Sequence, residues 1–224
     1  YNYGIKHDLV IKNPFVKVEK PQVANKDRKR LTVEEALKML QLCRERYPDF
    51  YALLATQIFT GVREGELLAL KWSDFDFKNG KLKIQRQYTA GELKESLKTS
   101  SSYRTIDIFP TLVRILKEHK KQQTLLSEFV FINSVGNLHN PRNLIQRRFE
   151  PLLEEMFGDR KYMRFYDLRG TYVDILLAEG LPLKYIQAQV GHSNFLTTMN
   201  AYSKLIKDVN EHAVDVLEKT VSIL

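Results

Sequence analysis

Cysteine, tryptophan and long apolar runs are scarce in this sequence. One of the 224 residues is a cysteine, Cys43, and one is a tryptophan. A single cysteine excludes an internal disulfide framework and is typical of a reducing compartment. No apolar run approaches the roughly 18 residues that a membrane span needs, and no signal peptide opens the chain. We therefore expect a cytoplasmic protein with no membrane partner and, because residue 1 is Tyr1 rather than methionine, a fragment.

The charge balance is basic. There are 35 Lys and Arg residues against 27 Asp and Glu residues, which gives a formal net charge of +8. With 43% hydrophobic and 28% charged residues, the composition is that of a globular chain of one or two domains, not of a disordered one. This basicity favours a nucleic-acid partner, although ribosomal and heparin-binding proteins share it.

Hydrophobic periodicity predicts a mainly helical protein. A capping box at residues 32–35 opens the first long helix. The predicted helices cover about residues 32–46, 50–60, 64–70, a stretch after Pro110, 141–157, 167–179, 182–190, 195–204 and 207–221. Alternation in 72–77 and 81–88, around Asn79-Gly80, predicts a hairpin, and 103–109 predicts a third strand. The fold class is therefore mainly α with a small three-stranded antiparallel β-sheet.

The first thirty residues predict a helix end followed by a linker. Residues 1–13 have the pattern of the last turns of a helix, which Asn13-Pro14 would end. The segment after them is polar and basic. Lys26, Arg28 and Arg30 in this linker are candidates for contact with a phosphate backbone, and a solvated tether is the alternative.

Arg63 and Glu66 form the first candidate site. Arg63 follows the glycine turn at Gly61 and opens the helix at 64–70, where a side-chain fork and backbone donors can face an anion. A guanidinium can bond two non-bridging phosphate oxygens at once. Glu66, one helical turn further on, can hold that guanidinium in place. A surface Arg–Glu helix pair is the alternative.

Three further residues form a second candidate site. Arg169 lies one turn after Tyr166 in an apolar stretch, so its charge needs a partner, either a phosphate or an internal salt bridge. His192 follows Gly191 at a helix end, where a capping or surface role is the alternative. Tyr202 follows ten residues later. These residues form neither a metal-ligand cluster nor a phosphate-binding glycine loop, so we expect no metal and no cofactor.

Four segments, in this order, resemble the catalytic domain of tyrosine recombinases, the phage-type and conjugative-transposon integrases. They are TGVREGELLALKW (60–72), LKTSSSYRTIDI (97–108), YDLRGTYVDILL (166–177) and VGHSNFLTTMNAYSKL (190–205). The resemblance covers about residues 31–205 and implies the DNA breaking-rejoining catalytic fold. It also implies that residues 1–25 are the end of a core-binding domain and a linker. Residues 26–224 would then be the catalytic domain with a C-terminal interaction helix.

The resemblance implies a role for each catalytic residue. Tyr202 would attack the scissile phosphate to form a 3′-phosphotyrosyl bond, which stores the energy of the cut bond. Arg63, Arg169 and His192 would stabilise charge on the non-bridging oxygens. Lys98, in the second segment, would protonate the leaving 5′-oxygen. The expected function is integration or excision of a mobile element.

Tyr166 is a departure from the family pattern, which has a histidine three residues before the second arginine. A free imidazole titrates near pH 6.5 and a free phenol near 10, so Tyr166 would be a poor general base at neutral pH. We keep it as a hydrogen-bonding site residue and leave the base unassigned. This residue keeps open a non-catalytic DNA-binding protein on a recombinase scaffold. A type IB topoisomerase is the other alternative, since it would use the same chemistry.

The expected main partner is double-stranded DNA. Candidate phosphate contacts are Lys26, Arg28, Arg30, Arg104, Arg147 and Arg148. The apolar stripe of the last helix implies, by the resemblance, packing onto a neighbouring protomer and a tetramer on DNA; packing within the same chain is the alternative. Accessory DNA-bending or directionality proteins are further partners that the family implies. The expected location is the nucleoid of a bacterial cytoplasm, with a bacterial or phage origin.

Overall fold

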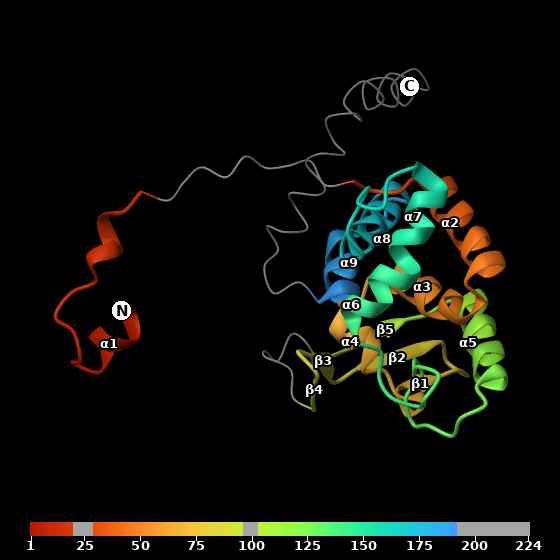
Figure 1. Ribbon diagram of the computed structural model, residues 1–224, viewed down its shortest axis with the longest axis horizontal. Coiled ribbons are helices and arrows are strands. Elements are labelled where there is room, and N and C mark those ends of the chain that lie inside the picture. Colours follow the sequence, from red (N-terminus) through yellow and green to blue (C-terminus); the bar gives the residue numbers. More distant parts are fainter. Residues whose placement is uncertain (20–28, 96–102, 192–224) are drawn as a thin grey trace, which may run out of the picture.

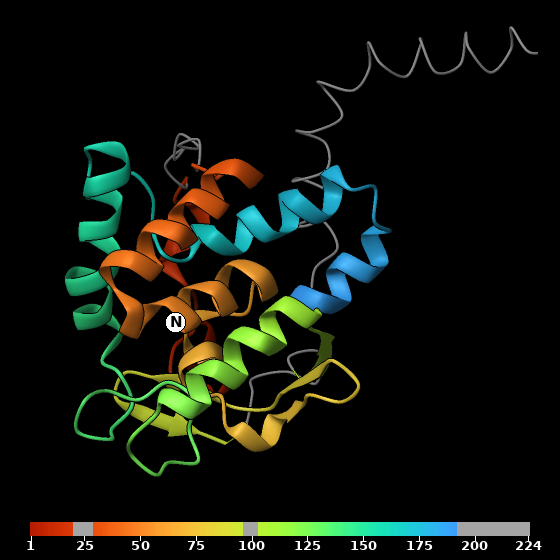
Figure 2. The ribbon, with the colours of Figure 1, turned by 90° about the vertical axis from the view of Figure 1, so that its right-hand side faces the viewer.

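The computed structural model describes residues 1–19, 29–95 and 103–191. The α-helices are α1 (Asn2–Lys6), α2 (Val33–Arg46), α3 (Pro48–Thr60), α4 (Glu64–Leu68), α5 (Pro110–Gln122), α6 (Pro141–Leu144), α7 (Glu150–Phe157), α8 (Asp167–Ala178) and α9 (Leu183–Val190). The strands are β1 (Phe75–Asp76), β2 (Lys81–Ile84), β3 (Gln87–Thr89), β4 (Glu92–Lys94) and β5 (Arg104–Asp107). Figures 1 and 2 show the strands at one end of the body formed by residues 29–191, with most helices on one side of them.

The predicted boundaries of α2 and α3 are close to those observed. The Thr32 hydroxyl accepts a hydrogen bond from the Glu35 amide at 3.1 Å, and the Glu35 carboxylate accepts one from the Thr32 amide at 2.8 Å. The predicted capping box is therefore confirmed. α3 contacts α2, α5 and α8, so its C-terminal end fixes the position of the residues that follow it.

One prediction about a helix end was wrong. Residues 1–13 are not one helical end, because α1 stops at Lys6 and Asp8 has a positive φ of 54°. Asn13 instead begins a 3₁₀ helix, η1 (Pro14–Lys17), and its side chain accepts from the Phe15 amide. The predicted helical span at 141–157 is confirmed, but it contains an unpredicted π-helical turn, η4 (Ile145–Phe149), between α6 and α7. In a regular α-helix the N–H of residue 151 would donate to the Arg147 carbonyl, but Pro151 has no N–H. The Arg147 carbonyl accepts from the Arg148 side chain at 3.2 Å instead.

The predicted three-stranded sheet is confirmed, with the order β1-β2-β5 and antiparallel pairing. Leu82 pairs with Ile106 and Ile84 with Arg104. Leu82, Ile84 and Ile106 are buried in the main hydrophobic core. Residues 81–88 are not one strand, because the chain leaves this sheet after Ile84 and forms a second hairpin, β3-β4, which the sequence did not predict.

The helix α9 rests on α8 and on β5. A small cluster of five buried residues, Tyr172, Val173, Leu177, Ile186 and Val190, joins α8 to α9. Figure 2 shows the two helices connected by a short turn at the edge of the body. The packing fixes where the last turn of α9 points. The predicted helices at 195–204 and 207–221 lie outside the described residues. None of the described helices is long and apolar enough to cross a membrane.

Candidate functional site

Arg63 is held at the junction of α3 and α4. Gly61 caps α3 in the left-handed region, with φ 57°, and an added Cβ there would lie 2.6 Å from the Tyr172 ring, so glycine is required on both grounds. Arg63 then precedes the first turn of α4, with 35% of its side chain exposed. Its Nη1 donates to Glu66 Oε1 at 2.8 Å, and its backbone amide donates to Glu66 Oε2 at 2.9 Å. The contact expected from the spacing is present.

Arg169 lies almost completely inside the protein, with 2% exposure. Its Nη1 donates to the Gly61 carbonyl at 2.6 Å and its Nη2 to the Val190 carbonyl at 2.5 Å. Its Nε is buried and has no hydrogen-bond partner among the described residues. A buried guanidinium whose donors reach two neutral carbonyls is a charge that still favours an anion nearby.

Three consecutive carbonyls at the end of α9 each accept a hydrogen bond from a different arginine. The Gln189 carbonyl accepts from Arg104 Nε at 3.0 Å, the Val190 carbonyl from Arg169, and the Gly191 carbonyl from Arg63 Nη2 at 2.9 Å. The last carbonyls of a helix carry partial negative charge and need donors. The end of α9 thus brings arginines from three distant segments together, and residue 192 follows directly.

Arg104 points into the protein and pairs with Glu66. Its side chain is 6% exposed, and its Nη1 and Nη2 donate to the two oxygens of Glu66 at 3.1 Å and 2.8 Å. The phosphate contact expected at Arg104 from the sequence stays a prediction. The residue pairs with a buried carboxylate, because β5 directs it inward toward α4 and α9.

The arrangement gives the site an excess of positive charge. Burial by itself raises the pKa of Glu66, but hydrogen bonds and charges from Arg104 and Arg63 lower it by more, so the pKa lies below its ordinary value. The pKa of Arg169 is lowered to about 10, first by burial and then by the charge of Arg63. Both groups are ionised near neutral pH. Among the described residues, the guanidinium groups of Arg63 and Arg104 bond the Glu66 carboxylate, and the charge of Arg169 also interacts with it.

Tyr166 stands immediately before α8 and is 46% exposed. It lies three residues before Arg169, as the sequence predicted. The other predicted catalytic residues, Lys98, His192 and Tyr202, lie outside the described residues. The structure thus brings Arg63, Glu66 and Arg169 together, with Tyr166 at the start of the same helix as Arg169.

The β3-β4 hairpin packs on the helix that follows Arg63. An added Cβ at Gly65 would lie 2.7 Å from the Tyr88 carbonyl oxygen, so glycine allows this close approach. The hairpin leads directly into the segment that contains Lys98. The contact at Gly65 therefore ties the start of that segment to Arg63.

Replacing Gly65 with alanine is expected to slow the DNA cleavage that the sequence resemblance implies roughly 10- to 100-fold. Alanine would favour the α4 helix by about 0.5–1 kcal/mol, but overpacking against a backbone oxygen costs about 1–3 kcal/mol. The hairpin must then shift, and a shift of about 1 Å in a catalytic group can cost about 100-fold in rate. Gly91→Ala is the matched control, because it strains the turn of the same hairpin (φ 83°) and meets nothing within 4 Å. Equal single-turnover rates for the two variants would contradict the expectation.

The other residues predicted to contact DNA differ, where the structure describes them, in how exposed they are and in which partners they have. Lys26 and Arg28 lie outside the described residues. Arg30 is half-buried and pairs with Asp174 at 3.2 Å and Asp167 at 3.8 Å. Its guanidinium lies over Gly170 on α8. Arg30 therefore joins the end of the linker to the helix that carries Arg169.

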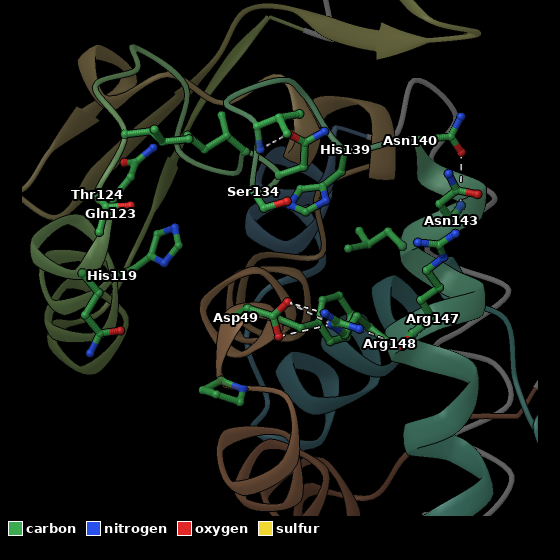
Figure 3. Close-up of a pocket in the computed structure, with 18 residues that line it drawn as sticks. Asp49, His119, Gln123, Thr124, Ser134, His139, Asn140, Asn143, Arg147 and Arg148 are labelled. Carbon is green, nitrogen blue, oxygen red and sulfur yellow. Dashed lines mark hydrogen bonds and ion pairs between the residues drawn. The ribbon is translucent and has the colours of Figure 1, made fainter.

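Arg147 and Arg148 line a hollow of about 750 Å³ formed by the start of α3, the end of α5, and α6 with its preceding loop. Figure 3 shows Arg148 and Asp49 turned toward each other, and Arg148 Nη2 lies 2.8 Å from Asp49 Oδ2. Arg147 is exposed beside them. Burial lowers the pKa of both His119 and His139 in this hollow, so neither ring adds positive charge near neutral pH. Of these groups, Arg147 remains the best placed for a phosphate contact.

Sequence reasoning missed Gln189, Asp107 and Tyr185. The Gln189 side chain is buried, accepts from the Asp107 amide and donates to the Asp107 carboxylate, both at 3.1 Å. The Tyr185 hydroxyl donates to the same carboxylate at 3.0 Å. These bonds join α9 to the strand that carries Arg104. The one signal in the sequence was a polar residue on the apolar side of a predicted helix.

Comparisons with known proteins match this chain to one family. A family model described as the phage integrase family matches residues 29–208. A tyrosine recombinase XerC-like protein of Caldanaerobacter subterraneus is 29% identical, over 97% of this chain and 62% of its own length. The ICEBs1 integrase of Bacillus subtilis is 25% identical, over 97% of this chain and 62% of its own length. The chain thus spans about three fifths of these curated relatives.

Solved structures share the fold. The Tn1549 transposon integrase in complex with transposon right end DNA has a TM-score of 0.75 at 21% identity, covering 95% of this chain and 75% of that one. The XerA recombinase has a TM-score of 0.67 at 20% identity, covering 94% of this chain and 71% of that one. The predicted fold class, mainly helical with a small antiparallel sheet, is confirmed.

Proposed function

The chain belongs to the phage integrase family, and we propose on this basis that it carries out site-specific DNA recombination. The reaction is integration or excision of a mobile element by cutting and rejoining strands through a 3′-phosphotyrosyl intermediate. The observation that carries the proposal is the convergence of Arg63 and Arg169 at the end of α9, with one carboxylate against three guanidinium groups. A phosphodiester is an anion that suits this excess of positive charge. The names of the relatives, a tyrosine recombinase and an integrase, support the same reaction.

In the proposed mechanism, Arg63 and Arg169 stabilise the charge that builds on the non-bridging oxygens. Arg63 is the partly exposed member of the pair and Arg169 the buried one, so Arg63 meets the phosphate first and Arg169 supplies a rigid charge behind it. His192 assists them, since its predecessor Gly191 is bonded to Arg63. Removing one such donor typically costs about 3–4 kcal/mol, or roughly 10²–10³ in rate.

Bond breaking is assigned to two further residues. The Tyr202 hydroxyl loses its proton to the base that the sequence leaves unassigned, and its oxygen attacks phosphorus. The bond from phosphorus to the 5′-oxygen breaks, and Lys98 gives that oxygen a proton. Because the phosphotyrosyl bond keeps the energy of the cut bond, rejoining needs no ATP, metal or other cofactor. Tyr166, half-exposed at the start of α8, donates or accepts a hydrogen bond at the phosphate or the nucleophile.

The partners and domains follow from the same proposal. Residues 1–25 are the end of a core-binding domain and a linker, and 26–224 form the catalytic domain with a C-terminal helix that packs on a neighbouring protomer. Double-stranded DNA is the substrate. The protein binds it as a tetramer, together with accessory DNA-bending or directionality proteins. Structures of the Tn1549 integrase contain circular intermediate or transposon end DNA, which supports DNA as the partner. The proposed location is the bacterial cytoplasm, at the nucleoid.

The experiment is covalent trapping on nicked duplexes that carry candidate end sequences of the element. Full-length protein is compared with Tyr202→Phe, and detergent-resistant protein–DNA adducts are measured. We expect an adduct with the wild type and none with the variant, while both bind the duplex equally. This expectation rests on the loss of the nucleophilic oxygen alone, because phenylalanine keeps the ring.

Tight binding without an adduct from the wild type would contradict the proposal. That outcome would favour a non-catalytic DNA-binding protein, and Tyr166→His, which restores the family residue, would then be tested for recovered cleavage. An adduct that persists in Tyr202→Phe would place the nucleophile elsewhere.

A further inference from the structure

Arg104 contacts both supports of Arg63. The first support is Glu66, whose Oε1 accepts from Arg63 Nη1 at 2.8 Å and from Arg104 Nη1 at 3.1 Å. The second is the end of α9, where the Gln189 carbonyl accepts from Arg104 Nε and the Gly191 carbonyl, two residues later, accepts from Arg63. One buried side chain therefore fixes the carboxylate and the helix end between which Arg63 is held.

We propose that Arg104 is a positioning residue for DNA cleavage, which acts by holding Glu66 and the α9 terminus so that the Arg63 guanidinium faces the scissile phosphate. The inference rests on the proposed function, because it names how that same site is organised. Arg104 acts through these two supports, since its side chain is 6% exposed and each of its three guanidinium nitrogens donates to Glu66 or to the Gln189 carbonyl.

The fork of Arg104 is needed for this role. Its Nη1 and Nη2 reach the two oxygens of one carboxylate while Nε reaches a backbone carbonyl in another direction. A planar guanidinium can make these three bonds at once, whereas a lysine ammonium on a flexible stem cannot reproduce their geometry. Without Arg104, Glu66 keeps its two hydrogen bonds from Arg63 and loses the two from Arg104, so the α9 terminus is no longer joined to this carboxylate through Arg104.

The positive charge of Arg104 also acts on the other two arginines of the site. Arg104 places a third positive charge near Arg63 and Arg169 and contributes to the lowering of the Arg169 pKa. This repulsion is offset by Glu66, which is 2% exposed and bonded to both Arg63 and Arg104. Removal of Arg104 would leave Arg63 as the one ionic partner of Glu66 among the described contacts, so the two residues would no longer be held by a second guanidinium.

The test compares two scissile groups in single-turnover adduct formation by full-length protein. One duplex carries the natural phosphodiester, and the other a methylphosphonate, whose methyl group replaces a non-bridging oxygen and removes the negative charge. We expect Arg104→Met to slow cleavage of the phosphodiester roughly 10- to 100-fold. Cleavage of the methylphosphonate should slow by less than about threefold, because its transition state carries less negative charge for Arg63 to stabilise. Arg104→Lys, which keeps the charge and most of the packing, should show an intermediate loss with the same substrate pattern.

Arg86→Met is the matched control. Arg86 is also buried, 11% exposed, and also bonded to a buried carboxylate, Asp74, at 2.5 Å, so its removal reproduces the loss of a buried ion pair. Its loss should affect both substrates equally. An equal loss on both substrates for Arg104→Met would overturn the proposal, because a general defect in folding has that signature.

A crystal structure of Arg104→Met decides the same question without activity. We expect the Arg63 guanidinium of this variant to be displaced from the Gly191 carbonyl. An Arg63 side chain in its wild-type position would overturn the inference. If the wild type binds DNA but forms no adduct, the proposed function fails while this structural comparison still tests the role of Arg104.

Discussion

Arg169→Ala is expected to lower the rate of covalent adduct formation by at least about 10²–10³-fold. In the proposed mechanism the variant removes a charge that stabilises the transition state, and such a charge typically contributes about 3–4 kcal/mol. It also leaves the Gly61 and Val190 carbonyls without their donor, and a buried unpaired group costs about 1–3 kcal/mol. Both effects follow from the placement of one guanidinium between the end of α3 and the end of α9. Single-turnover trapping and urea unfolding measure the two effects separately.

Two variants keep this expectation testable if Arg169→Ala is poorly folded. Arg169→Lys retains the charge and most of the packing but cannot reach both carbonyls in the same plane, so it should fold and still cleave slowly. Arg46→Ala removes an exposed arginine that pairs with Glu155 at 3.0 Å, and should change stability by less than about 1 kcal/mol with no change in rate. Cleavage by Arg169→Lys at the wild-type rate would show that the fork is not required.

Glu66→Gln is expected to lower the free energy of unfolding by about 3–5 kcal/mol at pH 7. The carboxylate is 2% exposed and bonded to two arginines, and removing one partner of a buried ion pair costs roughly this amount. Cleavage should also fall, since both the backbone and the side chain of Arg63 depend on Glu66. Glu155→Gln, at an exposed ion pair, is the control and should cost less than about 1 kcal/mol.

The effect of Glu66→Gln should depend on pH in one direction. The pKa of Glu66 in the folded protein lies below its ordinary value, so the folded state releases this proton more readily than the unfolded state. The stability it contributes is fully present above the unfolded pKa near 4.3 and is lost as the pH falls through the folded pKa. The difference between wild type and variant should therefore shrink in acid. A difference that grows below pH 4 in urea unfolding would contradict this assignment.

Local patterns were enough for much of the fold. The capping box at Thr32 and Glu35, the Asn79-Gly80 turn and the alternation in β2 each depend on residues within a few positions of one another. Such features form wherever the sequence places them. The end of α1 was mistaken because Asn13-Pro14 fits the start of a helical turn as well as the end of one.

The β3-β4 hairpin was missed for a different reason. Its short strands have a weak alternation, and their position depends on packing against Gly65 of α4. This contact is tertiary, so no window of the sequence contains it. The π-helical turn before Pro151 was missed as well, although the missing N–H of a proline was a usable signal.

The sequence alone determined which family the chain resembles, the identity of the catalytic candidates and the pairing of Arg63 with Glu66, because motif order and i,i+3 spacing are properties of the chain itself. Tertiary structure alone decided that Arg104 faces Glu66, and that three arginines meet the carbonyls of Gln189, Val190 and Gly191. The physical reason is distance along the chain. Arg63 and Gly191 are 128 residues apart, and only the packing of α9 on α8 and β5 brings the end of that helix to the arginines.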